Sequence, residues 1–555
     1  MCHNAALIMP KDGAMRQPAG PPGQRPDLGR AGHPAQVGPV RQSAPLTAAV
    51  CLAIAVASAT GRLDAQTTPP AAFEVHEKSI VELQDAMRSG LVSSVQLVDA
   101  YLARIRAYDQ DGPRINAMIA VNARARETAA ALDEERRTRG PRGLLHGIPV
   151  VVKDNYATVD MPTTGASKAL DGFQTGRDAF MVKKLRDAGA VIIGKTNLHE
   201  LAYGITSISS LGGQTRNPYD PTRNPGGSSG GTGAAVAAGF AAAGLGTDTC
   251  GSIRNPAASN NLVGLRGTAG LSSRDGILPL AHTQDIGGPL ARTVTDLAIV
   301  LDATVGFDPA DPNTRASEGR VPRTYFSTMG DISLQDTRIG ILTPLFGTAP
   351  EDAEVAGIAR QAIGAIGQLG ADVIEIAMPG LDDLLRGTSV ISAEFKFDLM
   401  DFLAAFPNAP VKTLGAIVAG GKYDPAIDGV LKRAEAVASR DSEAYRTALA
   451  KRDTTRDAVL AAMTSRGITA LAYPTLRRKP ARIGEPQAGS NCQLSPTTGL
   501  PAISIPAGFT EDGLPVGLDL LGLPFSEPAL LKAAYAYERS VAPRKPPRST
   551  PPLAQ

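Results

Sequence analysis

The chain has 555 residues, which is ample for a large hydrophobic core and by length alone would suggest roughly three or four domains. Its 56 Lys and Arg residues nearly balance its 54 Asp and Glu residues. This balance gives no electrostatic reason to expect binding to nucleic acid or to an anionic membrane. We therefore expect the partner of this protein to be a small molecule.

The N-terminal region differs from the rest of the chain. Residues 1–45 are rich in Pro, Gly and Arg, which predicts disorder or an extension that precedes the true start codon. Arg41, an apolar run over 46–59 and a short polar stretch then follow, so that residues 41–65 have the layout of a secretory signal peptide cleaved after Ala65. We expect a secreted or periplasmic protein with no stable membrane insertion after cleavage. An uncleaved anchor or a chance Ala-rich segment is the alternative.

Three helices are predicted next. A capping box of Ser79 and Glu82 predicts a helix that stops near Gly90. The second helix is capped by Ser93 or Ser94 and runs to about Tyr108, and the third, polar and Ala-rich, covers 123–139. We assign no chemistry to these helices.

The pattern changes after Gly147. Short β-branched runs over 148–152 and 190–193 alternate with helices such as 179–188. This alternation predicts an α/β fold with a largely parallel or mixed sheet covered by helices. Lys153 stands where the first strand meets a loop, a place where α/β folds commonly present catalytic groups.

The stretch 226–254 holds two serines in glycine-rich settings, Ser228 and Ser252. The Ala- and Gly-rich run between them has almost no large side chains and predicts a tightly packed inner helix. Glycines beside a serine leave backbone N–H groups free to point at a ligand. Two such serines in one short stretch favour acyl transfer with an oxyanion site.

Residues 189–196 fit the phosphate-binding pattern G-x-x-x-x-G-K-[ST] letter for letter. A P-loop needs a strand before its first glycine and an open loop inside the pattern, whereas the interior here is a buried-strand run. We therefore expect no nucleotide to bind there.

Residues 226–230 also fit the G-x-S-x-G nucleophile elbow of α/β-hydrolases. That mechanism needs a histidine downstream of the serine, and the only one in the chain is His282. A triad of Ser228, Asp248 or Asp275, and His282 is thus a possible but disfavoured alternative.

These segments resemble the amidase signature family, whose members use a Ser-Ser-Lys triad. The resemblance includes Gly147-Ile-Pro-Val-Val-Val-Lys153-Asp-Asn155 and the stretch 226–254, and the intervals of 75 residues from Lys153 to Ser228 and 24 from Ser228 to Ser252 are usual in the family. It extends from about Ser79 to Ser540. It implies one amidase domain over 66–545, with a large mixed, twisted sheet covered by helices on both faces, a catalytic core at about 145–300 and a variable, pocket-shaping region at about 315–470. A Pro-rich tail, 546–555, follows.

The resemblance implies a role for each residue of the triad. Ser252 is the expected nucleophile, and Ser228, held by a cis peptide after Gly227, relays its proton to Lys153. Lys153 can act as a base only when neutral, so burial must lower its pKa well below about 10.4.

Backbone N–H groups of a short loop are the expected oxyanion hole: Thr249, Cys250, Gly251 and Ser252. The family usually has glycine at the position of Cys250, which puts the size of the acyl pocket in question. Ser229, Asp248 and Arg254 are expected to support the triad through hydrogen bonds, with Arg254 pairing with Asp248. Loop scaffolding is the alternative role for these three.

The chain has four cysteines, of which Cys2 and Cys51 lie in the part we expect to be removed. Cys250 and Cys492 form no disulfide framework and have no metal-ligand spacing. Both fall in segments that the family places near the active site, so an oxidising compartment would allow a bridge between them.

We expect a metal-free and cofactor-free amidase that converts a carboxamide into a carboxylic acid plus ammonia or an amine through an acyl-enzyme. Alternatives are the amidase subunit of a tRNA-dependent amidotransferase, a carbamate or ester hydrolase on the same scaffold, and a non-catalytic binding protein. Residues 394–399 faintly resemble peptide-amidase-like members. The resemblance also leaves room for a homodimer, and the sequence does not name the substrate.

Overall fold

The computed structural model describes residues 73–330 and 332–553, which belong to one compact unit. The predicted N-terminal extension and signal peptide, 1–65, lie outside the described residues. Within the described ranges no helix is both long enough and apolar enough to cross a membrane.

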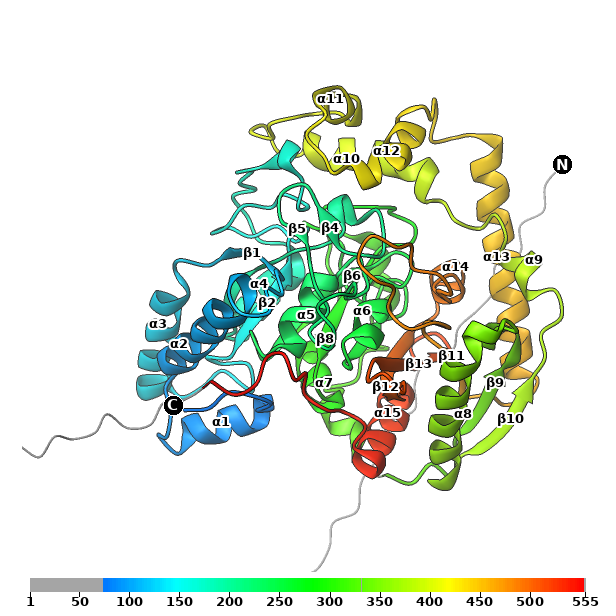
Figure 1. Ribbon diagram of the computed structural model, residues 1–555, viewed down its shortest axis with the longest axis horizontal. Coiled ribbons are helices and arrows are strands. Elements are labelled where there is room, and N and C mark those ends of the chain that lie inside the picture. Colours follow the sequence, from blue (N-terminus) through cyan, green and yellow to red (C-terminus); the bar gives the residue numbers. More distant parts are fainter. Residues whose placement is uncertain (1–72, 331, 554–555) are drawn as a thin grey trace, which may run out of the picture. The chain divides into compact units, whose positions relative to one another are not determined.

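An 11-stranded mixed sheet forms the centre of this unit (Figure 1). Its strands, in spatial order, are β1 (Met118–Val121), β3 (Val191–Thr196), β2 (Pro149–Lys153), β6 (Ala243–Asp248), β8 (Ile286–Ala291), β7 (Val263–Arg266), β12 (Ala502–Phe509), β13 (Pro515–Gly522), β11 (Ala470–Pro474), β9 (Arg338–Leu342) and β10 (Asp372–Ile376). A separate hairpin pairs β4 (Ile208–Ser209) with β5 (Gly213–Gln214). The predicted α/β class with a mixed sheet is confirmed.

Strand direction brings several polar residues to one edge of the sheet. β2 runs parallel to both β3 and β6, so the carboxyl ends of these strands meet at the same edge. Lys153 ends β2 and Asp248 ends β6. β8 is antiparallel to β6 and begins at this edge, opposite Asp248. The residues just before β8 therefore lie near the predicted site.

Fifteen α-helices are found in the described part of the chain: α1 (Ile80–Arg88), α2 (Ser94–Ile105), α3 (Ala125–Arg139), α4 (Phe180–Asp187), α5 (Gly230–Ala237), α6 (Arg254–Ser259), α7 (Val294–Thr304), α8 (Ala353–Gln368), α9 (Leu381–Leu385), α10 (Ile391–Ala404), α11 (Leu414–Gly420), α12 (Asp428–Glu435), α13 (Glu443–Thr464), α14 (Leu494–Thr498) and α15 (Glu527–Val541). The predicted capping box at Ser79 is present in α1, and of the two predicted caps of α2 the structure has Ser93, which also forms a capping box.

Helices cover both faces of the sheet, as two glycines of β13 demonstrate. A Cβ on Gly517 would lie 2.4 Å from Ala258 of α6, and a Cβ on Gly522 would lie 3.1 Å from Leu530 of α15. These positions are an odd number of residues apart, so their side chains would point to opposite faces of the strand. α6 and α15 therefore lie on opposite faces.

Two helix predictions need correction. The run between the two serines is helical only over α5, because Gly239 turns the chain with φ 69° and the following Ala and Gly residues form the central strand β6. Small side chains carry no apolar period, so the sequence could not separate buried helix from buried strand. The sequence pattern over 430–464 also predicts a single helix, and the structure divides this segment into α12 and α13.

The C-terminal tail packs against the fold as far as it is described. Thr550 is buried, and the backbone oxygens of Thr550 and Pro551 accept hydrogen bonds of 2.8 and 2.9 Å from Arg104 of α2. The Pro-rich tail is thus anchored by a buried guanidinium.

The helices α10 to α12 lie beyond the site edge of the sheet, where Figure 1 draws them in yellow. They share a second apolar cluster with loops that follow the core strands, including Leu399 and Leu431 from the helices and Leu201 and Leu278 from the loops. These three helices, which belong to the region 315–470, thus pack over loops that follow the core strands.

Candidate active site

The structure brings the predicted lysine and the first serine into contact. Lys153 Nζ donates hydrogen bonds of 2.7 Å to Ser228 Oγ and of 2.7 Å to Thr247 Oγ1. Ser228 stands just before α5, and the peptide bond between Gly227 and Ser228 is cis, as the resemblance implied. Lys153 and Ser228 are completely buried.

The surroundings of Lys153 favour the neutral amine. Burial lowers the pKa of Lys153 from its ordinary 10.5 to about 7, even though the nearby carboxylates of Asp285 and Asp248 act to raise it. A lysine with this pKa is partly neutral at physiological pH and can accept a proton. The required lowering of the pKa is therefore present.

Asp248 organises the loop that carries Ser252. Its carboxylate accepts hydrogen bonds from the backbone N–H groups of Gly251 (2.7 Å) and Ile253 (3.3 Å). The Gly251 amide, predicted to be one of the oxyanion donors, therefore already has a partner within the loop. Ser252 itself is joined to the other serine segment, because its carbonyl oxygen accepts a hydrogen bond of 3.2 Å from Ser229 N–H.

A buried chain of ion pairs holds this loop against the sheet. Arg254 pairs with Asp248 at 3.1 Å, as predicted, and with Asp519 of β13 at 2.6 Å. Burial alone would raise the pKa of Asp248, but Arg254 and Arg266 outweigh it and keep that pKa below its usual value. Asp248 and Arg254 therefore fix the loop, while Ser229 shares hydrogen bonds with the backbone of Thr247.

A disulfide joins Cys250 to Cys492, with the two Cα atoms 4.9 Å apart. It links the Ser252 loop to a segment that stands 242 residues later in the chain. The Arg254 guanidinium also donates to the carbonyl oxygen of Cys492 at 3.1 Å. Two contacts of different chemistry thus tie the same two segments together.

Several residues at the site were given no role from the sequence. Thr247 and Asn155 complete the polar surroundings of Lys153, since Asn155 Nδ2 donates to Thr247 Oγ1 at 3.1 Å. Asp285 accepts a hydrogen bond of 2.5 Å from Thr249 Oγ1. Thr247 could have been found from its place beside Asp248 on a buried strand. Nothing local in the sequence marks Asp285, because it reaches the site through the antiparallel start of β8.

The two competing motifs do not form sites. Residues 191–196 of the P-loop pattern are the fully buried strand β3, and Lys195 is paired with Asp154 at 3.0 Å. In the described residues no histidine ring hydrogen-bonds to Ser228 Oγ, and His282 is an exposed residue whose backbone N–H donates to Asp398. The disfavoured Ser228–His282 triad is wrong.

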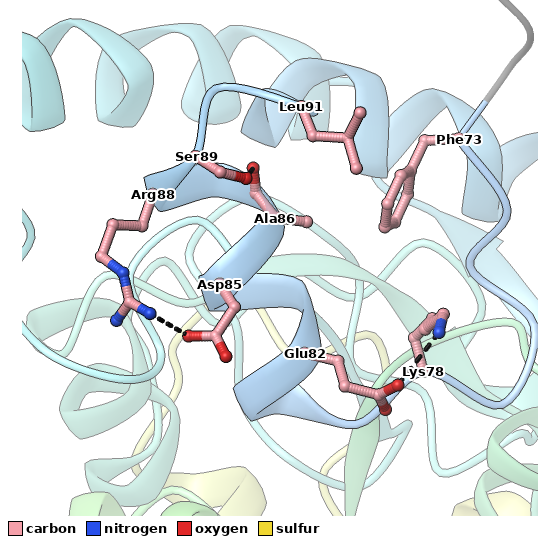
Figure 2. A pocket seen from close by; sticks show the side chains of 8 residues that line it. All are labelled: Phe73, Lys78, Glu82, Asp85, Ala86, Arg88, Ser89 and Leu91. Carbon is pink, nitrogen blue, oxygen red and sulfur yellow. Dashed lines mark hydrogen bonds and ion pairs between the residues drawn. The ribbon is translucent and has the colours of Figure 1, made fainter.

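One hollow near α1 shares no residue with the predicted site. A cavity of about 610 Å³ borders α1, and its charges are satisfied among themselves, with Lys78 paired to Glu82 at 3.0 Å and Arg88 to Asp85 at 2.7 Å (Figure 2). Among the described residues no group of three or more His, Cys, Asp and Glu side chains is arranged to hold a metal ion.

Comparison with known proteins identifies the family. The family model described as Amidase matches residues 96–531. The chain belongs to the amidase family. A probable amidase of Arabidopsis thaliana is 33% identical over 494 residues, which cover 86% of this chain and 92% of that protein. A glutamyl-tRNA(Gln) amidotransferase subunit of Halorhodospira halophila is 35% identical over 483 residues, covering 84% and 97%.

Solved structures of amidases have the same fold. The native peptide amidase of Stenotrophomonas maltophilia matches with a TM-score of 0.79 and 37% identity, covering 85% of this chain and 99% of that one. A glutamyl-tRNA(Gln) amidotransferase subunit of Thermotoga maritima matches with a TM-score of 0.68 and 27% identity, covering 84% and 96%. The protein is therefore a hydrolase that acts on amides.

Proposed function

We propose that this amidase hydrolyses a linear carboxamide to a carboxylic acid plus ammonia or an amine, through an acyl-enzyme on Ser252. The observation that carries the proposal is the 2.7 Å contact between Lys153 Nζ and Ser228 Oγ, in a site where Lys153 is buried and its pKa is about 7. A serine hydroxyl is inert at its own pKa and needs such a base within reach.

The proposed reaction uses the two serines in sequence. Ser252 Oγ attacks the amide carbon, its proton passes to the oxygen of Ser228, and the proton of Ser228 passes to the neutral amine of Lys153. The tetrahedral intermediate then expels the amine, which takes a proton from Ser228 as Lys153 returns its own. Water attacks the acyl-enzyme through the same relay and releases the acid and Ser252.

The oxyanion of the intermediate would be stabilised by backbone N–H groups of the loop before Ser252. Because the Gly251 amide donates to Asp248, we assign this role to the amides of Thr249, Cys250 and Ser252. Asp248 holds the conformation of the loop that carries these amides.

The test is product formation, followed by mass spectrometry, from a panel of primary amides, anilides, peptide amides, carbamates and esters. Wild type should hydrolyse at least one amide, Ser252→Ala and Lys153→Met should abolish this, and the exposed control Ser327→Ala should leave it unchanged. Activity that survives in Ser252→Ala would assign the nucleophile elsewhere. Turnover of carbamates or esters alone would favour that alternative on the same scaffold.

The 35% identity with the Halorhodospira halophila protein supports a second candidate function, that of the amidase subunit of a tRNA-dependent amidotransferase. Affinity purification of tagged protein from the native host distinguishes the two. Stoichiometric partner subunits, together with amide hydrolysis only in their presence, would favour the second candidate. Size-exclusion chromatography with light scattering on the same sample tests the predicted homodimer.

We also propose that the protein is secreted or periplasmic. The layout of residues 41–65 supports export, and so does the disulfide, because such bonds persist in oxidising compartments. Mature protein from the native host should begin near Gln66 and contain no free thiol when purified without reductant. A retained Met1, or two titratable thiols, would contradict export.

A further inference from the structure

A cavity of about 330 Å³ lies beside the Ser252 loop. We call it the Arg477 cavity, and its lining includes Leu345, Leu385, Arg477, Ser490, Gln493 and Leu494. Its volume is within the range of small-molecule sites, and polar side chains outnumber apolar ones in its wall.

The cavity shares a wall with the segment bonded to the Ser252 loop. Cys492 forms the disulfide with Cys250, and its two neighbours in sequence, Asn491 and Gln493, both line the cavity. A second link runs from the lining residue Ser490, whose hydroxyl accepts a hydrogen bond of 3.3 Å from Asn255 at the start of α6. The cavity thus borders a segment that is bonded to the loop of the proposed nucleophile.

Arg477 is the unusual group of this cavity. Its Nε is buried without a hydrogen-bond partner, and within the described residues its guanidinium takes part in no ion pair. The neighbouring Arg478 is paired with Asp352 at 2.9 Å, and Arg386 is paired with Asp383 at 2.7 Å. A guanidinium without a carboxylate partner, at the wall of a cavity, has N–H donors available for an acceptor from outside the chain.

The remaining lining restricts what that acceptor can be. Leu345, Leu385 and Leu494 suit an apolar spacer, and the Gln493 side-chain amide adds a neutral hydrogen-bonding group. Asp382 is exposed, whereas Arg477 is half-buried, so the one acidic side chain of the lining is the more accessible to solvent. The planar guanidinium matches the two oxygens of a carboxylate.

We propose that Arg477 determines substrate specificity by binding a carboxylate carried by the amide substrate, so that the enzyme prefers carboxylate-bearing amides to their neutral counterparts. This inference rests on the proposed amide hydrolysis at Ser252. Arg477 binds the substrate and takes no part in the chemical step, because the carboxylate that it binds is not the amide group that reacts.

Matched probes separate charge from size. The monoamides of succinic, glutaric and adipic acids place a carboxylate on the acyl side at three distances, and 4-acetamidobenzoate places one on the amine side. Each is compared with its methyl ester, which keeps the shape and removes the charge. The proteins are wild type, Arg477→Gln, Arg477→Lys, and Arg478→Gln as the matched control outside the cavity.

Wild type should favour at least one carboxylate over its ester by about 10- to 100-fold in kcat/KM, as charge-assisted hydrogen bonds allow. Arg477→Gln should remove this preference, while kcat/KM for amide hydrolysis of the methyl-ester probes should stay within about twofold of wild type. Arg477→Lys should restore part of the preference, and Arg478→Gln should retain all of it. Equal losses for the carboxylate and its ester in Arg477→Gln would mean a merely structural role and overturn the proposal.

Binding measured by calorimetry to Ser252→Ala keeps the inference separate from catalysis. Tighter binding of a carboxylate than of its ester to Ser252→Ala, lost in Ser252→Ala/Arg477→Gln, supports the role of Arg477. This holds even if wild type hydrolyses none of the probes. In that case only the proposed amide hydrolysis fails. Hydrolysis of the amide bond in the methyl-ester probes, with no preference for the carboxylates in kinetics or in binding, would support the proposed amide hydrolysis and reject the role of Arg477. No preference and no binding for any probe also rejects it.

Discussion

The pH dependence of kcat/KM is the most direct consequence of the burial of Lys153. A pKa near 7 lies about 3.5 below the ordinary 10.5, which corresponds to about 5 kcal/mol against the charged form in the folded protein. The neutral amine is then about half of the population at pH 7 and roughly a tenth at pH 6. We expect kcat/KM to fall about tenfold per pH unit below 7 and to reach a plateau above pH 8.

The assay is initial rates on a neutral amide that does not titrate, between pH 5 and 9 at constant ionic strength. A profile that is flat over this range, or one whose limb lies near pH 10, would refute the assignment of Lys153 as the base. The control is Ser327→Ala, which should follow wild type.

Stability offers an independent measurement of the same pKa. Because the folded pKa of Lys153 is below its unfolded value, the penalty for burying the amine is complete below pH 7 and disappears as the pH rises to about 10.5. Lys153→Met removes this penalty. Its advantage in unfolding free energy over wild type should therefore shrink by about 2–3 kcal/mol between pH 7 and pH 9 in urea titrations. A constant difference would contradict the lowered pKa.

Two further predictions concern the scaffold of the site. Lys195→Met leaves the buried carboxylate of Asp154 without its partner, 3.0 Å away, and should lower the unfolding free energy by about 3–5 kcal/mol; a loss below about 1 kcal/mol in urea titration would contradict this. Gly231→Ala would place a Cβ 2.2 Å from the backbone oxygen of Asn197 and should prevent soluble expression, whereas Gly364→Ala, with open space around it in α8, should be neutral or stabilising by up to about 1 kcal/mol. Comparable thermal midpoints for the two glycine variants would refute the packing argument.

Much of the fold was predictable where the signal is local. The capping boxes at Ser79 and Ser93 define the starts of two helices, because the same residues that satisfy the first turn are adjacent in sequence. The run over 230–248 was only half predicted, since its Ala and Gly residues fit either a buried helix or a buried strand. Which of the two forms depends on the spatial neighbours of the run, and these come from distant parts of the chain.

For the site, the sequence by itself determined which side chains could act: a lysine at a strand end and two serines among glycines, at intervals typical of a known family. Only the tertiary structure decided their chemistry. Burial lowers the pKa of Lys153, and the start of β8 brings Asp285 to Thr249. Asp248 accepts the hydrogen bond of the Gly251 amide. The structure also decided that Arg477 takes part in no ion pair within the described residues and lines a cavity near the disulfide, because pairing, burial and proximity depend on residues far apart in the chain.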